Sequence, residues 1–513
     1  MKISDLRALV PADHTLRDHQ QRNLSALLDI SRSFARSAGL KESTTNSVQD
    51  DTVVLESGHQ PNYFPYTGVW KKVYLLETFR EMLDADGMSV VAYFGFADQN
   101  TTTAPFLYKN QVPALNKYGR QKIGFSVKGP DKWRRFENIP KPPLEVWEEE
   151  MRRLENLYPR MKTNHPEIME IMWDGYERAD SFSDLNAYIF SRISQDILEC
   201  DVIFFRYSAI SRAQLFSDEC TRILRNLDTY TEVYNAAIKK LRLPSRPVLS
   251  GEVPFWYHCD CGGNIPLMTN APGMCRGICP ICTREFELDF APDFSRFESY
   301  AYRMSLSAVS RNLIFPEAFG THIFIPGRGG GVRYGKISDE IAHALGFHQP
   351  STCSWSSKDY YLGSVHTKSL RELQKAFSLS NNDLLDAHLK ERIDAVQEER
   401  RRALKETEDA GADMATLRLL RGRLIGSAVT ADMAAGVFAT VPSMFDLFMN
   451  RSGTEIAQRW SIELQVSVPE RSTGRSCVID GDVVFDGEEE AGFSREDIPI
   501  LYRNLTAIGG IGT

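Results

Sequence analysis

The sequence predicts an α/β protein, and three observations support this prediction. Apolar runs at 53–55 and 89–96 enclose a segment, 69–79, in which apolar residues recur at helical spacing. Two strands joined by a helix form a βαβ unit, which is the building block of parallel sheets. A strand-like run, a group of glycines and a helical stretch follow one another again at 321–345, and five cysteines fall within 259–282.

Length and composition are those of a folded protein with more than one core. For 513 residues we expect about two to four domains. The net charge of −8 at pH 7 argues against unspecific binding of nucleic acid. No apolar run reaches the roughly 20 residues of a membrane span, and the first residues contain no apolar signal core. Nine cysteines, an odd number, suit a reducing compartment, so we expect a cytoplasmic protein.

The elements outside the first βαβ unit follow from the same spacing rules. Apolar periodicity predicts helices at 4–40, 144–158, 181–198 and 211–243 and a buried strand at 201–206. Proline-rich and polar stretches separate them.

These elements divide the chain into six predicted regions. They are an N-terminal helical segment (1–50), the first part of an α/β core with a helical insertion (51–250), a cysteine-rich ribbon (251–292), the second part of the core with a glycine loop (293–368), a long helical arm (369–430) and a C-terminal segment (431–513). The arm has loosely heptad apolar positions, and a coiled coil there would pair two copies of the chain as a homodimer. A small hairpin is expected at 477–485, because Asp480-Gly481-Asp482 suits a tight turn.

The ribbon has the cysteine spacing of a metal site. Two close pairs, each accompanied by glycine or proline at a tight turn, can close tetrahedrally on one ion: Cys259, Cys261, Cys279 and Cys282. Four sulfurs leave no open coordination position, which predicts a structural zinc ion in a zinc ribbon. Cys275 and His258 are spare ligands, and the alternative is a group of chance cysteines in a reduced core.

A glycine-rich loop follows the strand-like run at 321–326. It consists of Gly327, Arg328, Gly329, Gly330 and Gly331, and a helical stretch comes after it. Backbone N–H groups of such a loop can bind a phosphate, and the arginine adds charge. The loop is neither a Walker loop nor a good dinucleotide fingerprint, and an ordinary tight turn is the alternative.

Polar residues gather where both strands of the first βαβ unit should end. They are Ser57, Gly58, His59, Gln60 and Asn62 after the first strand, and Asp98, Gln99 and Asn100 after the second. Ligands of open parallel sheets bind outside the carboxyl ends of the strands. Lys71 and Lys72 follow on the helix, and with His59 they would bind a ligand that bears phosphate. In the alternative interpretation His59 caps the helix and the lysines are solvated.

The order of these features resembles the BshC family, cysteine ligases of bacillithiol biosynthesis. In that family a helical N-terminus leads into a strand ending Thr-Gly-Gln-Gln-Pro/Ala-Gly, and a helix with Tyr and Lys follows. Here residues 56–61 and 69–74 stand at those places. The family's Glu-Asp-His-Asp corresponds to residues 97–100, and its Gly-Gly-Pro-Gly-Glu-x-x-Tyr loop is similar to residues 327–334, which end in Tyr334. The resemblance covers most of the chain as an order of features, with short local matches.

This resemblance implies a Rossmann-like nucleotide-binding core with inserted segments and a dimerising coiled-coil arm. It also implies a ligase that forms an amide bond between an amino acid, typically cysteine, and an amino-sugar conjugate. Three departures leave the substrates open: the Gln-Gln is His59-Gln60, the acidic cluster is reduced to Asp98, and a zinc ribbon interrupts the middle of the chain.

A second resemblance is local. The run from His59 to Lys72, HQPNYFPYTGVWKK, is similar to the opening motif of the WbqC-like family, which is associated with surface-polysaccharide biosynthesis. It covers under a tenth of the chain and implies an amino-sugar or sugar-nucleotide ligand.

Together these features predict an ATP-using ligase, or a related transferase, that acts on an amino acid and an amine or sugar acceptor. Residues 57–60 and the loop 327–331 would hold the nucleotide or substrate phosphate, and Lys71 or Lys72 would offset its charge. Asp98 would be the general base or orient the amine.

In the same scheme Gln99 and Asn100 position the acceptor, Asn62 and Tyr334 contribute to binding, and His59 belongs to the catalytic set. The competing class is a zinc-ribbon module that binds RNA or a protein partner, and the acidic balance of the chain disfavours its RNA version.

Overall fold

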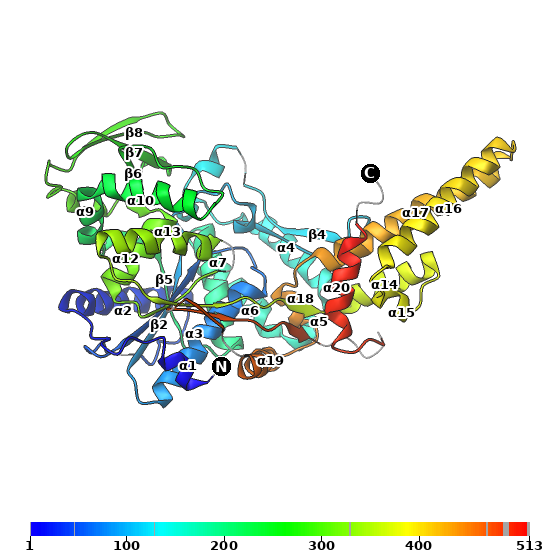
Figure 1. Ribbon diagram of the computed structural model, residues 1–513, viewed down its shortest axis with the longest axis horizontal. Coiled ribbons are helices and arrows are strands. Elements are labelled where there is room, and N and C mark those ends of the chain that lie inside the picture. Colours follow the sequence, from blue (N-terminus) through cyan, green and yellow to red (C-terminus); the bar gives the residue numbers. More distant parts are fainter. Residues whose placement is uncertain are drawn as a thin grey trace.

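The computed structural model describes residues 2–45, 47–127, 129–327, 330–467, 470–473, 475–485 and 492–509. It has a mixed α/β fold around one seven-stranded sheet, in the order β14-β15-β12-β11-β1-β2-β5 (Figure 1). Its strands are β1 (Val53–His59), β2 (Val90–Phe96), β5 (Ile203–Arg206), β11 (Ile323–Ile325), β12 (Ser351–Trp355), β14 (Glu470–Thr473) and β15 (Ser476–Ile479). All neighbours pair in parallel except β14 with β15. The expected α/β class and the first βαβ unit are therefore confirmed.

The chain crosses the sheet in two runs that both start at its centre. From β1 it passes to β2 and then to β5, and it later returns to β11, on the other side of β1, and passes to β12 and β15. The direction of winding thus reverses between β1 and β11, which is where open α/β sheets form their ligand crevice. β1 is buried on both faces: Val53 and Leu55 belong to one hydrophobic cluster and Val54 to the other.

Helices cover both faces of the sheet. In the first two thirds of the chain they are α1 (Ile3–Arg7), α2 (Asp18–Ala38), α3 (Thr67–Ala85), α4 (Leu144–Leu157), α5 (Pro159–Asn164), α6 (Pro166–Arg178), α7 (Phe182–Arg192), α8 (Tyr207–Arg212), α9 (Ser217–Arg225), α10 (Leu227–Lys240), α11 (Glu298–Ala301), α12 (Ala308–Phe319) and α13 (Gly330–Leu345). The helix expected at 4–40 is in fact two helices, because Pro11 and the polar residues after it separate α1 from α2. No helix in the described ranges is long and apolar enough to cross a bilayer.

A five-stranded antiparallel sheet is inserted between α10 and α12. Its order is β10-β6-β7-β8-β9, with β6 (Glu252–His258), β7 (Asn264–Ala271), β8 (Met274–Ile278), β9 (Glu285–Asp289) and β10 (Met304–Leu306). We call this sheet the cysteine module. β10 lies beyond residue 292, so the sheet is larger than the ribbon expected from the cysteines alone. Leu267 and Phe255 join the same cluster as Val54, which packs the module onto the body of the protein.

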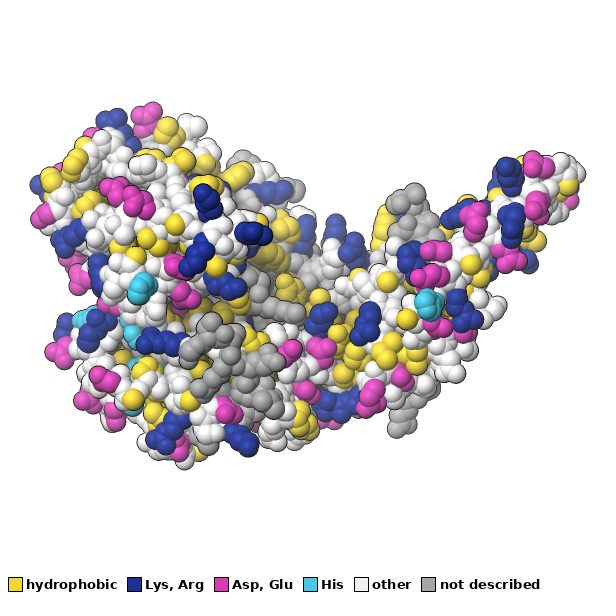
Figure 2. All heavy atoms as spheres, viewed as in Figure 1, with side chains coloured by type: hydrophobic (Ala, Val, Ile, Leu, Met, Phe, Trp, Pro, Cys, Tyr) yellow, Lys and Arg dark blue, Asp and Glu magenta, His cyan; other side chains and the backbone are white. Residues whose placement is uncertain are grey.

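The C-terminal third carries the projecting arm. Its helices are α14 (Ser364–Phe377), α15 (Asn381–Leu385), α16 (Leu389–Asp409), α17 (Met414–Ala439), α18 (Met444–Phe448), α19 (Gly453–Val466) and α20 (Asp497–Ala507). The arm expected as one long helix is a helical hairpin: α16 and α17 turn back at Gly411, whose φ of 72° lies in the left-handed region that favours glycine. Figure 1 shows the pair extending away from the body, and Figure 2 shows basic and acidic side chains mixed along it.

The prediction of a small hairpin at 477–485 is wrong. β15 joins the central sheet beside β12, whereas β16 (Val483–Phe485) pairs in parallel with β13 (Asp359–Tyr361). Both strands find partners more than a hundred residues away in sequence, so the turn at 480–482 only redirects the chain from one sheet to another. A further two-stranded sheet is formed by β3 (Lys109–Pro113) and β4 (Arg120–Gly124).

The turn between β3 and β4 fixes the base of the arm. A Cβ atom on Gly436 of α17 would lie 2.0 Å from the carbonyl oxygen of Tyr118, so only glycine allows this contact, whereas a Cβ atom on Gly426 would meet nothing within 4 Å.

We therefore predict opposite effects of the same substitution at these two positions. Gly436→Ala should lower the free energy of unfolding by about 1–3 kcal/mol through overpacking. Gly426→Ala, the matched control, should raise it by about 0.5–1 kcal/mol, because alanine is the better helix former. Chemical denaturation followed by circular dichroism measures both, and stabilisation by both substitutions would contradict the contact.

Candidate functional site

The polar residues expected at the strand ends lie at one edge of the central sheet. β1 is longer than the expected run 53–55, so Ser57, Gly58 and His59 are its last residues, whereas Asp98, Gln99 and Asn100 follow β2. The two strands pair in register up to His59 opposite Phe96, and this brings the ends of both strands together as expected. Gly58 and Gly95 also lie opposite each other in this register. The ring of Tyr207, the first residue of α8, covers both: a Cβ atom would lie 2.3 Å from its hydroxyl oxygen at Gly58 and 2.1 Å from its Cε1 at Gly95.

His59 is an uncharged acceptor at this edge. Burial and the neighbouring Lys72 lower the pKa of His59 to about 3, so the imidazole is neutral at physiological pH. Its Nδ1 lies 3.0 Å from the carbonyl oxygen of Gln60 and donates to it, since a carbonyl only accepts. The proton on Nδ1 leaves Nε2 as a hydrogen-bond acceptor. His59 therefore cannot supply positive charge to a phosphate, and its low pKa makes it a weak base unless a bound anion stabilises the protonated ring.

Lys72 and Lys71 are adjacent in sequence and differ in environment. Lys72 Nζ donates to the carbonyl of Gly58, and burial, together with Arg311, lowers the pKa of Lys72 to about 7. Lys71 Nζ lies 3.0 Å from Asp359 Oδ1 and 2.7 Å from Ser357 Oγ, in a fully buried ion pair. A third contact, 3.2 Å, is a hydrogen bond from Nζ to the carbonyl of Ser357. The contacts of Lys71 are thus all made within the protein, and Lys72 is the better placed of the two lysines for the predicted phosphate contact.

The side chain of Asp98 forms hydrogen bonds with the start of α8. It is fully buried and accepts hydrogen bonds from the backbone N–H (3.0 Å) and the hydroxyl (2.5 Å) of Ser208. Burial and the negative charge of Glu137 raise the pKa of Asp98 to about 6. Its two oxygens thus accept from the first turn of α8, and its predicted role as a general base or as an amine-orienting carboxylate stays a prediction. Gln99 likewise uses its side-chain oxygen for the hydroxyl of Ser211, at 3.1 Å.

Three other residues that were predicted to bind the ligand also make contacts within the protein. The hydroxyl of Ser57 donates to the carbonyl of Ile325 on β11, at 2.8 Å, so it ties two strands together. The backbone carbonyl of Asn100 accepts a hydrogen bond from the backbone N–H of Phe136, at 2.9 Å. Tyr334 packs on the hydrophobic cluster below α13.

The glycine loop is shorter than the sequence predicts. α13 begins at Gly330, so Gly330 and Gly331 form its first turn, while Arg328 and Gly329 lie outside the described residues. The N-terminus of this 16-residue helix follows β11 at the point where the winding of the sheet reverses. The dipole of the helix favours an anion there, while the N–H of Val332 in its first turn donates to the carbonyl of Gly327, at 3.2 Å.

Two charged residues at the same edge have no clear signal in the sequence. Arg311 on α12 places its guanidinium 4.8 Å from the ring centroid of Tyr207. Glu56, on the face of β1 that carries Gly58, accepts hydrogen bonds from the hydroxyls of Tyr93 (2.9 Å) and Thr321 (2.6 Å). Burial raises the pKa of Glu56 to about 7. A carboxylate inside an apolar strand was the one sign in the sequence that pointed to Glu56.

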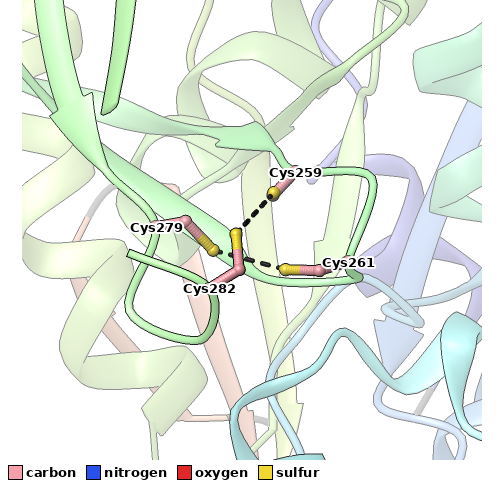
Figure 3. Close-up of side chains that lie close together, drawn as sticks. All are labelled: Cys259, Cys261, Cys279 and Cys282. Atoms are coloured by element: carbon pink, nitrogen blue, oxygen red, sulfur yellow. Dashed lines mark hydrogen bonds between the residues drawn. The ribbon is translucent and has the colours of Figure 1, made fainter. Parts of the chain in front are cut away.

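The four predicted metal ligands converge in the cysteine module. The sulfurs of Cys259, Cys261, Cys279 and Cys282 all lie within 4.8 Å of one another and point to a common centre (Figure 3). Two of the separations are 3.5 Å, between Cys259 and Cys282, and 3.4 Å, between Cys261 and Cys279. Thiolates in this arrangement can hold a metal ion. The spare ligand Cys275 is a separate, fully buried residue of β8 and is not part of the group.

The turn between the first cysteine pair and β7 contacts the edge of the central sheet. The carbonyls of Gly262 and Gly263 accept from the backbone N–H (2.8 Å) and the guanidinium (3.0 Å) of Arg135. The side-chain amide of Asn264 donates to the carbonyl of Gln99, at 2.9 Å. A Cβ atom on Gly263 would lie 2.7 Å from the sulfur of Cys279, so glycine is required for this turn to close around the metal ligands. The cysteine module thus supports the loop that carries Asp98.

Neither the protein-family models nor the curated proteins compared with this sequence give a match. The chemistry of the edge therefore has to be argued from its own residues. Four groups lie near the point where the winding of the sheet reverses. They are a cationic arginine, a lysine with a lowered pKa, a helix N-terminus and a neutral histidine acceptor.

The environment of Lys72 predicts a specific pH dependence of stability. The folded pKa of about 7 lies below the ordinary value of 10.5, so the side chain is charged in both states below pH 7 and neutral in both above about pH 10.5. Between these limits the unfolded chain binds more protons, and the free energy of unfolding rises with pH.

Lys72→Met should remove this contribution. We expect the variant to gain stability over the wild type at pH 6, and the gain to shrink as pH rises from 7 to 10, in urea denaturation at each pH. The exposed Lys239→Met serves as the control and should follow the wild-type curve. Parallel curves for Lys72→Met and the wild type would contradict the lowered pKa.

Proposed function

We propose that the protein is an ATP-using ligase, or a related transferase, whose nucleotide phosphates bind at the reversal between β1 and β11. The observation that carries the proposal is the strand order. Numbered along the chain, the six parallel strands lie in the order 3-2-1-4-5-6, which is that of the doubly wound Rossmann-like nucleotide-binding sheets. The BshC resemblance implies the same core, and the N-terminus of α13 lies where such sheets bind phosphate.

The charged groups at this edge suit a phosphoryl ligand. Arg311 is permanently cationic, and a phosphate beside Lys72 would raise the pKa of that lysine and so keep it charged. In the proposed reaction a carboxylate oxygen of an amino acid attacks a phosphorus of ATP, and the P–O bond to the leaving group breaks, which releases ADP from attack at the γ-phosphorus or pyrophosphate from attack at the α-phosphorus. The nitrogen of an amine then attacks the carboxyl carbon, the C–O bond to the phosphoryl group breaks with release of phosphate or AMP, and the amine gives up a proton. A phosphate bound at this edge would raise the low pKa of His59 as well, and Nε2 of His59 would then accept this proton.

The cysteine module has a structural role in this proposal. Its four sulfurs complete a tetrahedral set, which leaves no coordination position for a substrate, and zinc is the metal that such sets prefer. Its contacts with residues 99 and 135 place it as the support of the loop after β2.

Binding of RNA by the module is the weaker alternative, because its arginines face carboxylates. Arg276 lies 2.9 Å from Glu287, and Arg303 and Arg284 both face Asp260. A surface whose cations are neutralised within the protein offers little to a phosphate backbone.

Nucleotide binding is tested by thermal shift. A ligand that binds only the folded state raises the midpoint of unfolding, so we expect ATP to raise that of the wild type and to leave Arg311→Ala unshifted. Arg225→Ala, an exposed arginine on α9, is the matched control and should respond like the wild type. A shift by sugar nucleotides and not by ATP would replace the ligase with the polysaccharide function that the WbqC-like motif implies. No shift by either would contradict a nucleotide site.

The metal is tested by elemental analysis of purified protein. We expect one zinc ion per chain, lost in Cys279→Ser because three sulfurs hold the ion less tightly than four. Cys275→Ser should keep its zinc, since this buried cysteine lies outside the group. Equal zinc contents in the two variants would contradict the site.

A further inference from the structure

A small recess lies beside the carboxyl end of β1. It is enclosed by the segment that follows the strand, by α3 and by α7, and has room for one water-sized group. Its walls are the aromatic side chains of Phe64, Trp70 and Phe190. The ring of Phe190 also packs 5.7 Å from that of Phe96, the cross-strand partner of His59. The recess therefore adjoins the side of the sheet edge on which His59 lies.

Two buried acceptors face this recess. The side-chain oxygens of Asn62 and Asn186 have no hydrogen-bond donor among the described residues, although the two side chains are only 5% and 3% exposed. A buried acceptor without a donor costs free energy. Two of them in one recess indicate a ligand with two donors.

The orientation of Asn186 is fixed by the protein. Its amide nitrogen donates to the carbonyls of Pro61 and Leu107, both at 2.8 Å and neither a residue that lines the recess, which leaves the oxygen as the polar atom of Asn186 for a ligand there. The helix that carries it is also fixed, because Ser181 and Asp184 form a capping box at the start of α7. The indole N–H of Trp70, the donor in the wall, is used by the carbonyl of Pro65 at 2.9 Å.

The charges around the recess favour an uncharged ligand group. No acidic or basic side chain is among the described residues that line it. On α3 the two residues after Trp70 are Lys71 and Lys72, and on α7 the carboxylate of Asp184 is paired with Arg206. An ammonium ion here would be desolvated without a counter-charge, which is costly.

We propose that this recess binds the –NH2 group of a small amine in its uncharged form, each N–H donating to one of the two asparagine oxygens. Binding as the free base leaves the nitrogen lone pair available for attack on a carboxyl carbon. The identification of this amine as the acceptor of the ligase rests on the proposed function. The amine site itself is independent of nucleotide and is tested without it.

The experiment uses O-methylhydroxylamine, a weakly basic amine that is uncharged at neutral pH, as the probe. Saturation-transfer NMR on the full-length protein should show its binding to the wild type, and weak or no binding of its N,N-dimethyl derivative, which has no N–H donor. Asn62→Leu should bind the probe roughly five- to tenfold more weakly, as expected for one lost hydrogen bond. The exposed Asn226→Ala is the control and should bind like the wild type.

A second variant keeps the shape of the recess and reverses its charge preference. Asn62→Asp supplies the missing counter-charge, so it should bind methylammonium, which the wild type should not. Absence of probe binding to the folded wild type, as when the recess holds only water, would overturn the proposal. So would equal binding of the probe and its dimethyl derivative, or equal binding of methylammonium by the wild type and Asn62→Asp. If the probe binds as expected but ATP gives no shift, the amine site stands and the ligase does not.

Discussion

The loop after β2 is held by hydrogen bonds from outside the central sheet, and the geometry of the sheet edge depends on them. Its three carbonyls, those of residues 98, 99 and 100, accept from Glu137, Asn264 and Phe136. The segment around residue 136 is itself tied to the cysteine module through Arg135. A metal ion held by the four cysteines would therefore order the edge at a distance, because binding of such an ion is coupled to folding of the turns that carry its ligands. This coupling would explain why the cysteine module is inserted within the core and not attached at one of its ends.

The edge carries positive charge that the fold itself does not use. Lys71 and Lys72 make the contrast clear, since one forms a buried ion pair with Asp359 and the other has only a backbone carbonyl and an aromatic ring as described partners. A buried lysine without a carboxylate is destabilising. Such groups persist where a ligand supplies the missing charge, and stability is commonly given up at binding sites in this way.

Local patterns in the sequence predicted local structure, and long-range partners could not be predicted. The βαβ unit and the cysteine group each lie within a few dozen residues, so apolar periodicity and ligand spacing were sufficient. The roles of Lys71 and Asp98 depend on Asp359 and Ser208, which are far away in sequence. The prediction of a hairpin at 477–485 failed for the same reason. Parallel pairing of β15 with β12 and of β16 with β13 outweighed a favourable turn. Arg311 enters the site only through the packing of α12, which no local pattern encodes.

The pleat of β1 divides the site into two halves. Side chains alternate along a strand, so Glu56 lies on one face, with Tyr93 and the cluster that contains Val54, and His59 lies on the other, beside the recess. Gly58 comes between them and carries no side chain, and Lys72 reaches its carbonyl from the face of His59. A ligase has to bring a phosphorylated carboxylate and an amine together from separate sites. Phosphate bound beside Arg311 and an amine bound in the recess would meet beyond the carboxyl end of β1, because Tyr207 fills the space over Gly58.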